Sequence, residues 1–113
     1  MIEQRPWGFY EVLLDTSYTK VKQITVNPGQ RLSYQYHNQR KEHWTIVQGS
    51  ATIILDDEKY FRYPGESIKI PLGAKHRIMN EEKFPLIFIE VQVGEYFGED
   101  DIVRIEDDYG RTE

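Results

Sequence analysis

Short segments of strand-forming residues, broken by turn residues about every ten positions, limit what this chain can fold into more than any other feature. The segments are rich in Val, Ile, Thr, Tyr and Phe, and Pro-Gly, Gly-Ser, Asp-Asp and Pro-Leu-Gly turns lie between them. No apolar repeat of 3.6 residues persists long enough to predict an amphipathic helix. The pattern therefore predicts an all-β fold, arranged as a sandwich or a barrel. The expected strands are Phe9–Leu14, Lys20–Val26, Arg31–His37, Glu42–Val47, Ala51–Leu55, Lys59–Tyr63, Ser67–Ile70, His76–Met79 and Leu86–Val93.

The length of the chain, 113 residues, suits one domain, and we expect a single domain over residues 1–113. One helical turn is expected near Glu99–Val103, where acids precede Arg104. The segment from Glu106 onward is acidic and polar, and its end is expected to fray. No apolar run reaches the roughly 18 residues of a membrane-spanning helix, and the first residues lack an apolar signal region. We therefore expect a cytoplasmic protein with no membrane partner.

Charge and cysteine content exclude several classes of function. The chain has no cysteine, which removes disulfides, cysteine-based zinc sites and thiol nucleophiles. Nineteen Asp and Glu against fourteen Lys and Arg give a net charge of -5. Because such a surface repels a phosphate backbone, we expect no nucleic-acid partner. A small anion would need a local cluster of basic side chains.

Two hairpin-like units each carry a histidine, and together they define the candidate site. The alternation of a strand places Gln35 and His37 on one face, and Glu42 opens the next strand after a turn. His76 opens a later strand after a tight turn. If a closed barrel brings the units together, an amide oxygen, two imidazoles and a carboxylate form a set suited to a divalent first-row metal. An isolated strand histidine is more often a structural residue, so that alternative stays open.

The spacing of glycines, histidines and the glutamate resembles a known pair of motifs. The first stretch reads Gly29-x5-Gln35-x-His37-x4-Glu42-x6-Gly49 and the second reads Gly65-x5-Pro71-x-Gly73-x2-His76-x3-Asn80. They resemble the two motifs of the cupin superfamily, with Gln35 in place of the first histidine. The resemblance implies an all-β double-stranded β-helix, the cupin jelly-roll barrel. It also implies the metal ligands Gln35, His37, Glu42 and His76.

Further residues, spread over nearly the whole chain, narrow the resemblance. They are Arg5-Pro6-Trp7-Gly8, Lys20-Val21-Lys22, Leu32-Ser33-x-Gln35-x-His37, Arg40-x-Glu42-His43-Trp44, Pro71-x-Gly73-x-Lys75-His76-Arg77, Glu90-Val91-Gln92 and Gly98-Glu99-Asp100-Asp101-Ile102-Val103-Arg104. Together they resemble the C-terminal cupin domain of type II mannose-6-phosphate isomerases, which bacteria usually fuse to mannose-1-phosphate guanylyltransferases. One departure is that Asn38-Gln39 replaces the last two of three consecutive histidines often seen in the family.

The resemblance implies a metal-dependent isomerase that interconverts mannose 6-phosphate and fructose 6-phosphate through an enediolate. A divalent ion, Zn²⁺ first and Mn²⁺, Co²⁺, Ni²⁺ or Fe²⁺ as alternatives, would polarise the reacting oxygens. His43 lies on the opposite strand face from Glu42, so we interpret it as a non-ligand. The expected catalytic residues are Arg40 in an electrostatic role, Glu90 as a candidate base beside a metal-bound water, and Arg104. The expected substrate contacts are Lys20, Lys22, Ser33 and Arg77.

Alternatives to this interpretation stay open. Lys20 and Lys22 can instead extend to the barrel rim, and Arg104 can pair with Asp100 or Asp101. The altered Asn38-Gln39 pair leaves open a non-catalytic cupin that binds a sugar or sugar nucleotide, either regulatory or a partner of a separate guanylyltransferase.

Two further expectations concern other cupin enzymes and assembly. A dioxygenase-type cupin is disfavoured because Gln35 stands where such enzymes have a histidine. Tyr34 and Tyr36 alternate with the ligand face, and exposed aromatic residues there would support a homodimer.

Overall fold

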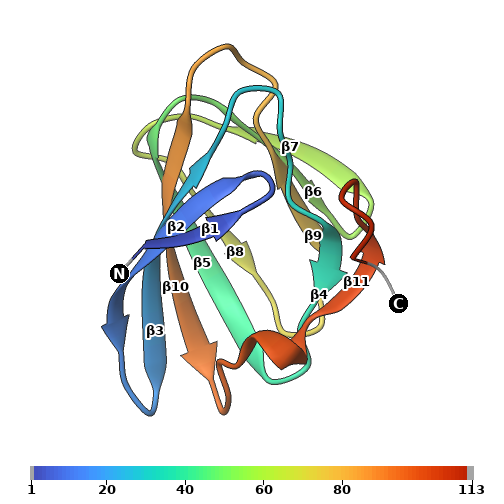
Figure 1. Cartoon of the computed structure of the whole chain (residues 1–113). Coiled ribbons are helices and arrows are strands. Elements are labelled where there is room, and N and C mark those ends of the chain that lie inside the picture. Colours follow the sequence, from blue (N-terminus) through green and yellow to red (C-terminus); the bar gives the residue numbers. More distant parts are fainter. Residues whose placement is uncertain (1, 112–113) are drawn as a thin grey trace.

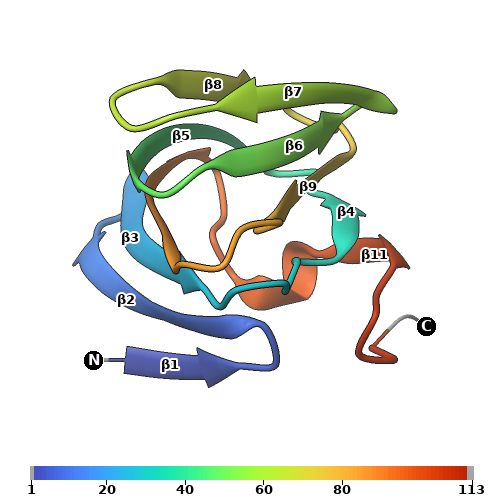
Figure 2. The same cartoon turned by 90° about the horizontal axis from the view of Figure 1, so that it is seen from above.

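Two antiparallel sheets surround a common interior in this computed structural model, which describes residues 2–111 (Figure 1). The view from above shows the strands arranged around that interior (Figure 2). In chain order the elements are β1 (Ile2–Arg5), β2 (Gly8–Asp15), β3 (Thr19–Val26), β4 (Tyr34–Tyr36), β5 (Arg40–Gln48), β6 (Ala51–Leu55), β7 (Glu58–Arg62), β8 (Ser67–Ile70), β9 (His76–Met79), β10 (Leu86–Gly94), the 3₁₀ turn η1 (Glu99–Asp101) and β11 (Val103–Glu106).

Strands that are distant in the sequence are neighbours in both sheets. The first sheet has the order β1-β2-β3-β10-β5-β8, and the second has the order β11-β4-β9-β6-β7. β10 lies between β3 and β5 and is antiparallel to both, while β9 lies between β4 and β6. This exchange of strands is the arrangement of a double-stranded β-helix, so the predicted all-β jelly-roll fold is confirmed.

The inward-facing row of each central strand changes from apolar to polar along its length. On β10 the buried residues are, in order, Leu86, Phe88, Glu90 and Gln92. On the antiparallel partner β5 the row in the same direction is Ile46, Trp44, Glu42 and Arg40. One end of the interior is therefore an apolar core, to which each fully buried large side chain contributes about 1.5–3 kcal/mol. The other end is polar and carries the candidate site.

Two short edge strands, β1 and β11, lie outside the strands expected from the sequence. Most of their side chains are exposed, so neither shows the apolar alternation that marks a half-buried strand. The expected strand Arg31–His37 is too long, because only Tyr34–Tyr36 pair regularly and Arg31 makes an isolated bridge with Met79. The expected helical turn is present as η1, although Val103 already begins β11. Within residues 2–111 we find no helix with the length and apolar character needed to cross a bilayer.

The segment that follows β11 is held by side chains as far as Arg111, and the end of the chain, where fraying is expected, lies outside the described residues. Arg31 donates from Nε to the Asp108 carboxylate at 2.6 Å. Tyr109 donates its hydroxyl proton to Gln30 at 2.5 Å. These contacts tie the segment to the loop before β4, so residues up to Arg111 have defined positions beside the barrel.

Candidate functional site

Two histidines and a glutamate meet in the polar end of the barrel. His37 follows β4, Glu42 lies on β5 and His76 opens β9, and all three are buried. His37 Nε2 is 3.3 Å from Glu42 Oε2, and His76 Nε2 is 3.7 Å from Glu42 Oε1. The centres of the two imidazole rings are 5.1 Å apart. The structure therefore brings together three of the four side chains expected to bind a metal.

Backbone carbonyls fix the orientation of both imidazoles. His37 Nδ1 lies 3.1 Å from the carbonyl oxygen of Asp101, and His76 Nδ1 lies 2.9 Å from that of Ala74. With a proton on each Nδ1, both Nε2 lone pairs face Glu42. Burial, followed by the positive charge of Arg40, lowers the pKa of His37 to about 4. At neutral pH His37 is thus an uncharged imidazole.

The donor atoms of this set fit a divalent metal ion. His76 Nε2 is buried and has no hydrogen-bond partner within the described part of the chain. Such an atom costs free energy unless something binds it. The ligand atoms of His37, Glu42 and His76 lie within 4.8 Å of one another. Two neutral imidazoles and one carboxylate are ligands that zinc and its first-row neighbours accept.

The Glu42 carboxylate is held from both sides by neighbours on β5. Arg40 donates from Nε to Oε2 at 3.0 Å, and Trp44 donates from its indole nitrogen to Oε1 at 3.1 Å. Arg40 Nη2 also lies 3.3 Å from His37 Nε2. Arg40 is therefore a buried counter-charge for Glu42, and an ion bound by His37 would take the place of this last contact.

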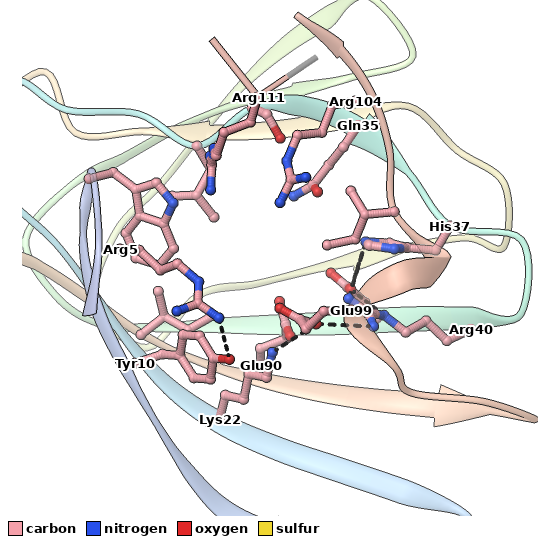
Figure 3. A pocket seen from close by; sticks show the side chains of 16 residues that line it. Arg5, Tyr10, Lys22, Gln35, His37, Arg40, Glu90, Glu99, Arg104 and Arg111 are labelled. Atoms are coloured by element: carbon pink, nitrogen blue, oxygen red, sulfur yellow. Dashed lines mark hydrogen bonds and ion pairs between the residues drawn. The ribbon is translucent and has the colours of Figure 1, made fainter. Parts of the chain in front are cut away.

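Gln35, the fourth expected ligand, lies beside the set on β4. Its backbone pairs with His76 on one side and with Arg104 on the other. Its side chain lines the same cavity as His37, and Figure 3 shows its amide end near the guanidinium group of Arg104. The role of Gln35 as a metal ligand stays a prediction.

The site opens into a pocket with an empty volume of about 480 Å³, which includes the solvent at its open mouth (Figure 3). Five cations and three acids line it. They are Arg5, Lys22, Arg40, Arg104 and Arg111, and Glu42, Glu90 and Glu99. The lining is therefore net positive, although the chain as a whole has a charge of -5.

Two acids other than Glu42 shape the charge of the cavity. Glu90 is buried on β10 and accepts a short hydrogen bond from Gln92. Burial, followed by the negative charge of Glu42, raises the pKa of Glu90 to about 7. Glu99 of η1 lies 3.4 Å from Lys22 Nζ and 3.7 Å from Arg40 Nη1. Lys22 and Arg40 therefore already have carboxylate partners.

The structure divides the expected substrate contacts into two groups. Lys22 and Ser33 line the cavity, whereas Lys20 and Arg77 are not part of its lining. Lys20 shares the inward row of β3 but lies near the outer end of the strand. Arg77 follows His76 and faces the opposite side of β9, where it donates to the carbonyls of Leu32 and Glu106 at 2.8 and 3.2 Å. The assignment of Arg77 to the site is therefore wrong, and its contacts are structural.

The expected alternative for Arg104, an ion pair with a nearby aspartate, is also wrong. Asp101 accepts hydrogen bonds from the backbone nitrogens of Asn38 and Gln39 at 3.2 and 2.9 Å. Asp100 accepts the hydroxyl proton of Tyr96 at 2.5 Å. Both carboxylates are thus bound elsewhere, and the Arg104 side chain points into the cavity (Figure 3).

Four charged residues of the site were missed by the sequence reasoning: Arg5, Glu99, Asp101 and Arg111. Arg5 lines the cavity from the end of β1, and the turn that follows is held at the end of β3, where Asn27 N donates to the carbonyl of Trp7 at 2.9 Å. A Cβ atom added at Gly8 would lie 2.1 Å from the carbonyl oxygen of Thr25, so that turn requires glycine. The Arg-Pro-Trp-Gly run could have signalled this turn. Nothing in the spacing marks Asp101 or Arg111.

Comparison with known proteins agrees with this architecture. A family model described as "Mannose-6-phosphate isomerase C-terminal" matches residues 2–107. The chain belongs to this family. The cupin domain of Schizosaccharomyces pombe Cnp3 has a TM-score of 0.78 at 12% identity, covers 83% of this chain and 68% of that chain, and shows the fold alone. The resemblance stated from the sequence is thereby confirmed.

Two curated relatives are much longer than this chain. The xanthan biosynthesis protein XanB of Xanthomonas campestris is 51% identical over 108 residues, which are 96% of this chain and 23% of XanB. The mannose-1-phosphate guanylyltransferase of Escherichia coli K12 is 48% identical over the same length, again 96% of this chain and 23% of the relative. The chain thus spans about a quarter of the length of the curated relatives it matches.

The names of these relatives correct the expected activity. They are those of a guanylyltransferase and of a polysaccharide biosynthesis protein, and neither is the name of an isomerase. The prediction of a mannose-6-phosphate isomerase is therefore wrong, and the catalytic roles given to Arg40, Glu90 and Arg104 fall with it. Their positions in the cavity leave them as candidates for binding a ligand.

Proposed function

We propose that this chain is a binding domain for a phosphorylated sugar, and that it serves a mannose-1-phosphate guanylyltransferase. One observation carries the proposal: a net positive cavity opens directly onto the His37, Glu42 and His76 set. A sugar phosphate has an anionic end that cations bind and a hydroxyl-bearing ring that polar side chains bind. Lys22 and Ser33 are the expected contacts that line the cavity.

A divalent metal ion, with Zn²⁺ first, is part of the proposal. His37, Glu42 and His76 would hold it, with Gln35 as a further ligand, and the unpartnered Nε2 of His76 supports this. When bound, the ion would supply a Lewis acid for sugar oxygens. The carbonyls of Asp101 and Ala74 hold the imidazoles in the required orientation.

The proposed partner is a guanylyltransferase, in the same polypeptide or as a separate protein. The length and the names of the relatives support this. The cytoplasmic location and the homodimer stay predictions. The homodimer has lost one support, because Tyr34 is buried and donates its hydroxyl proton to Asp57 at 2.7 Å.

Calorimetric titration of the metal-free and zinc-loaded protein tests the proposal. Mannose 1-phosphate or mannose 6-phosphate should bind at least about tenfold more tightly than mannose, a difference of about 1.4 kcal/mol. His76→Ala should lose zinc, whereas His43→Ala, on the exposed outer face of β5, should keep it. Equal affinity for mannose and its phosphates would contradict the proposal. Conversion of mannose 6-phosphate into a ketose by the protein would contradict a role limited to binding.

A further inference from the structure

Three arginines from distant segments line one side of the cavity. Arg5 ends β1, Arg104 lies on β11, and Arg111 follows β11. In Figure 3 Arg5 and Arg111 lie across the cavity from His37 and Arg40, with the guanidinium group of Arg104 between them. We call Arg5, Arg104 and Arg111 the arginine cluster.

Two members of the arginine cluster have no carboxylate partner in the structure's described part. Arg104 Nε is buried without a hydrogen-bond partner. Arg5 donates to two neutral oxygens, the Tyr10 hydroxyl at 3.0 Å and the Gln4 carbonyl at 2.8 Å. Burial, followed by repulsion from Arg111, lowers the pKa of Arg104.

Arg111 differs from the other two because it is bound to Asp107. Its Nε and Nη2 donate to the two carboxylate oxygens at 2.8 and 3.2 Å. This ion pair fixes the Arg111 side chain beside Arg104, and the Asp107 carboxylate neutralises the positive charge of Arg111. Among residues 2–111, the arginine cluster therefore includes two guanidinium groups, those of Arg5 and Arg104, that no carboxylate binds directly.

The cations near His37 and Glu42 differ from the arginine cluster because they already have carboxylate partners. Lys22 and Arg40 share Glu99, and Arg40 also holds Glu42. An anionic group entering there would have to displace a carboxylate. At the arginine cluster the anionic group would contact two guanidinium groups without displacing a carboxylate. The arginine cluster is therefore the more favourable position for a dianion.

The register of the second sheet gives the distance between the arginine cluster and the set of His37, Glu42 and His76. Arg104 lies opposite Gln35, and Gln35 lies opposite His76 on the other side of β4. Two strand spacings, about 10 Å, therefore separate the backbones of Arg104 and His76. This is about the length of a hexose phosphate, so one such molecule can reach both.

We propose that Arg5, Arg104 and Arg111 form the subsite for the phosphoryl group of the ligand, with the sugar ring directed toward His37, Glu42 and His76. The inference deepens the proposed function and rests on it. At pH 7 a phosphate monoester carries a charge of about -1.5 to -2, which the guanidinium groups of Arg5 and Arg104 can neutralise. Guanidinium groups bind phosphate oxygens in a bidentate manner, which a lysine does not reproduce.

Calorimetry on Arg5→Gln and Arg104→Gln, with Arg62→Gln as the matched control, tests this subsite. Arg62 lies on β7 and donates to the carbonyl of Ser67 outside the cavity. Each cavity variant should bind mannose 1-phosphate at least about tenfold more weakly than the wild type, and inorganic phosphate likewise, while the control stays within about twofold. If both cavity variants bind the sugar phosphate as the control does, the subsite is refuted while the proposed function stands. If the wild type binds no sugar phosphate at all, both fail.

Urea denaturation of the same variants separates a binding arginine from a structural one. Since Arg104 has a buried nitrogen without a partner, Arg104→Gln should have an unfolding midpoint equal to or above that of the wild type. A marked loss of stability would assign Arg104 a structural role and refute its place in the subsite. The half-exposed Arg5 gives the second variant, so the binding test does not depend on Arg104→Gln folding.

A sugar nucleotide carries the same chemistry in a diphosphate, so guanosine diphosphate mannose is titrated in parallel. Weaker binding of mannose 1-phosphate to both cavity variants supports the monoester subsite, whether or not the sugar nucleotide follows. Weaker binding of the sugar nucleotide alone refutes the monoester assignment.

Discussion

The apolar and polar ends of the barrel interior are both built from β5 and β10, yet one end stabilises the fold and the other carries the candidate site. On β10, Leu86 and Phe88 are fully buried among apolar neighbours, and Glu90 and Gln92 continue the same inward row. The apolar end releases free energy by removing hydrocarbon from water, whereas the polar end costs free energy for each charge that it buries. The comparison teaches that stability and binding are separated along the strands within one interior.

The largest expected effect is on the apolar end. Phe88→Ala should lower the free energy of unfolding by about 3–5 kcal/mol, because it removes a fully buried ring and leaves a cavity. Val93→Ala, at an exposed position of the same strand, should cost no more than about 0.5 kcal/mol. Urea denaturation of metal-free protein measures both. Similar losses in the two variants would show that the apolar end is not the main source of stability.

The second effect concerns the buried charges of the polar end. Glu42→Gln should cost about 3 kcal/mol in metal-free protein, because Arg40 then lacks the carboxylate that it contacts at 3.0 Å. The double variant Arg40→Met, Glu42→Leu should be more stable than the single variant, because it buries no unpaired charge. Urea denaturation ranks the two. A double variant below the single one would mean that the ion pair stabilises the fold.

The third effect tests the support behind His37. Asp101→Ala should cost about 1–2 kcal/mol, because two backbone nitrogens in part-buried hydrogen bonds lose their acceptor. It should also weaken zinc binding about tenfold or more, because the carbonyl that orients His37 moves with this residue. Competition with a chelator measures the zinc affinity. Asp100→Ala, at an exposed neighbour, is the control, and equal zinc affinity in the two variants would refute the supporting role.

The last expected effect is a pH dependence at the polar end. Glu90 has a pKa of about 7 when folded and an ordinary value near 4.5 when unfolded. Between these pH values the folded state keeps a proton that the unfolded state has lost, so this contribution to stability falls as the pH rises. His37 acts in the opposite direction between about pH 4 and 6.5, because it is protonated only in the unfolded state there.

Comparison of the metal-free wild type with Glu90→Gln isolates the glutamate. The stability of the wild type relative to this variant should fall as the pH rises from about 4.5 to 7 and then level off. Urea denaturation across this range measures the difference. Glu82→Gln, on the exposed loop before β10, should show the wild-type profile. A constant difference between the wild type and Glu90→Gln would contradict the raised pKa.

The sequence predicted the central strands and which of their residues face inward, because the alternation of apolar residues sets the inward rows. It failed at β1 and β11, whose side chains are mostly exposed and whose pairing depends on the rest of the sheet. It also placed Arg77 in the site, although residues next to each other on a strand face opposite sides and His76 already faced inward.

Only part of the candidate site was predicted from the sequence. The spacing of the two motifs located His37, Glu42 and His76, whose convergence follows from the fold. Arg5 and Arg111 come to the cavity only through the edge strands β1 and β11, which the pattern did not reveal. Unpaired charge is a property of the assembled interior, so no local signal in the sequence marks it.

The segment from Glu99 to Arg111 has a consequence for the order in which a growing chain gains its properties. β1 to β10 already contain the apolar cluster, apart from the packing of Tyr109 against it. The carbonyl that orients His37, the carboxylate between Lys22 and Arg40, and two of the cavity's arginines are all translated later. A growing chain therefore receives the residues of its apolar cluster before it receives these residues of its site.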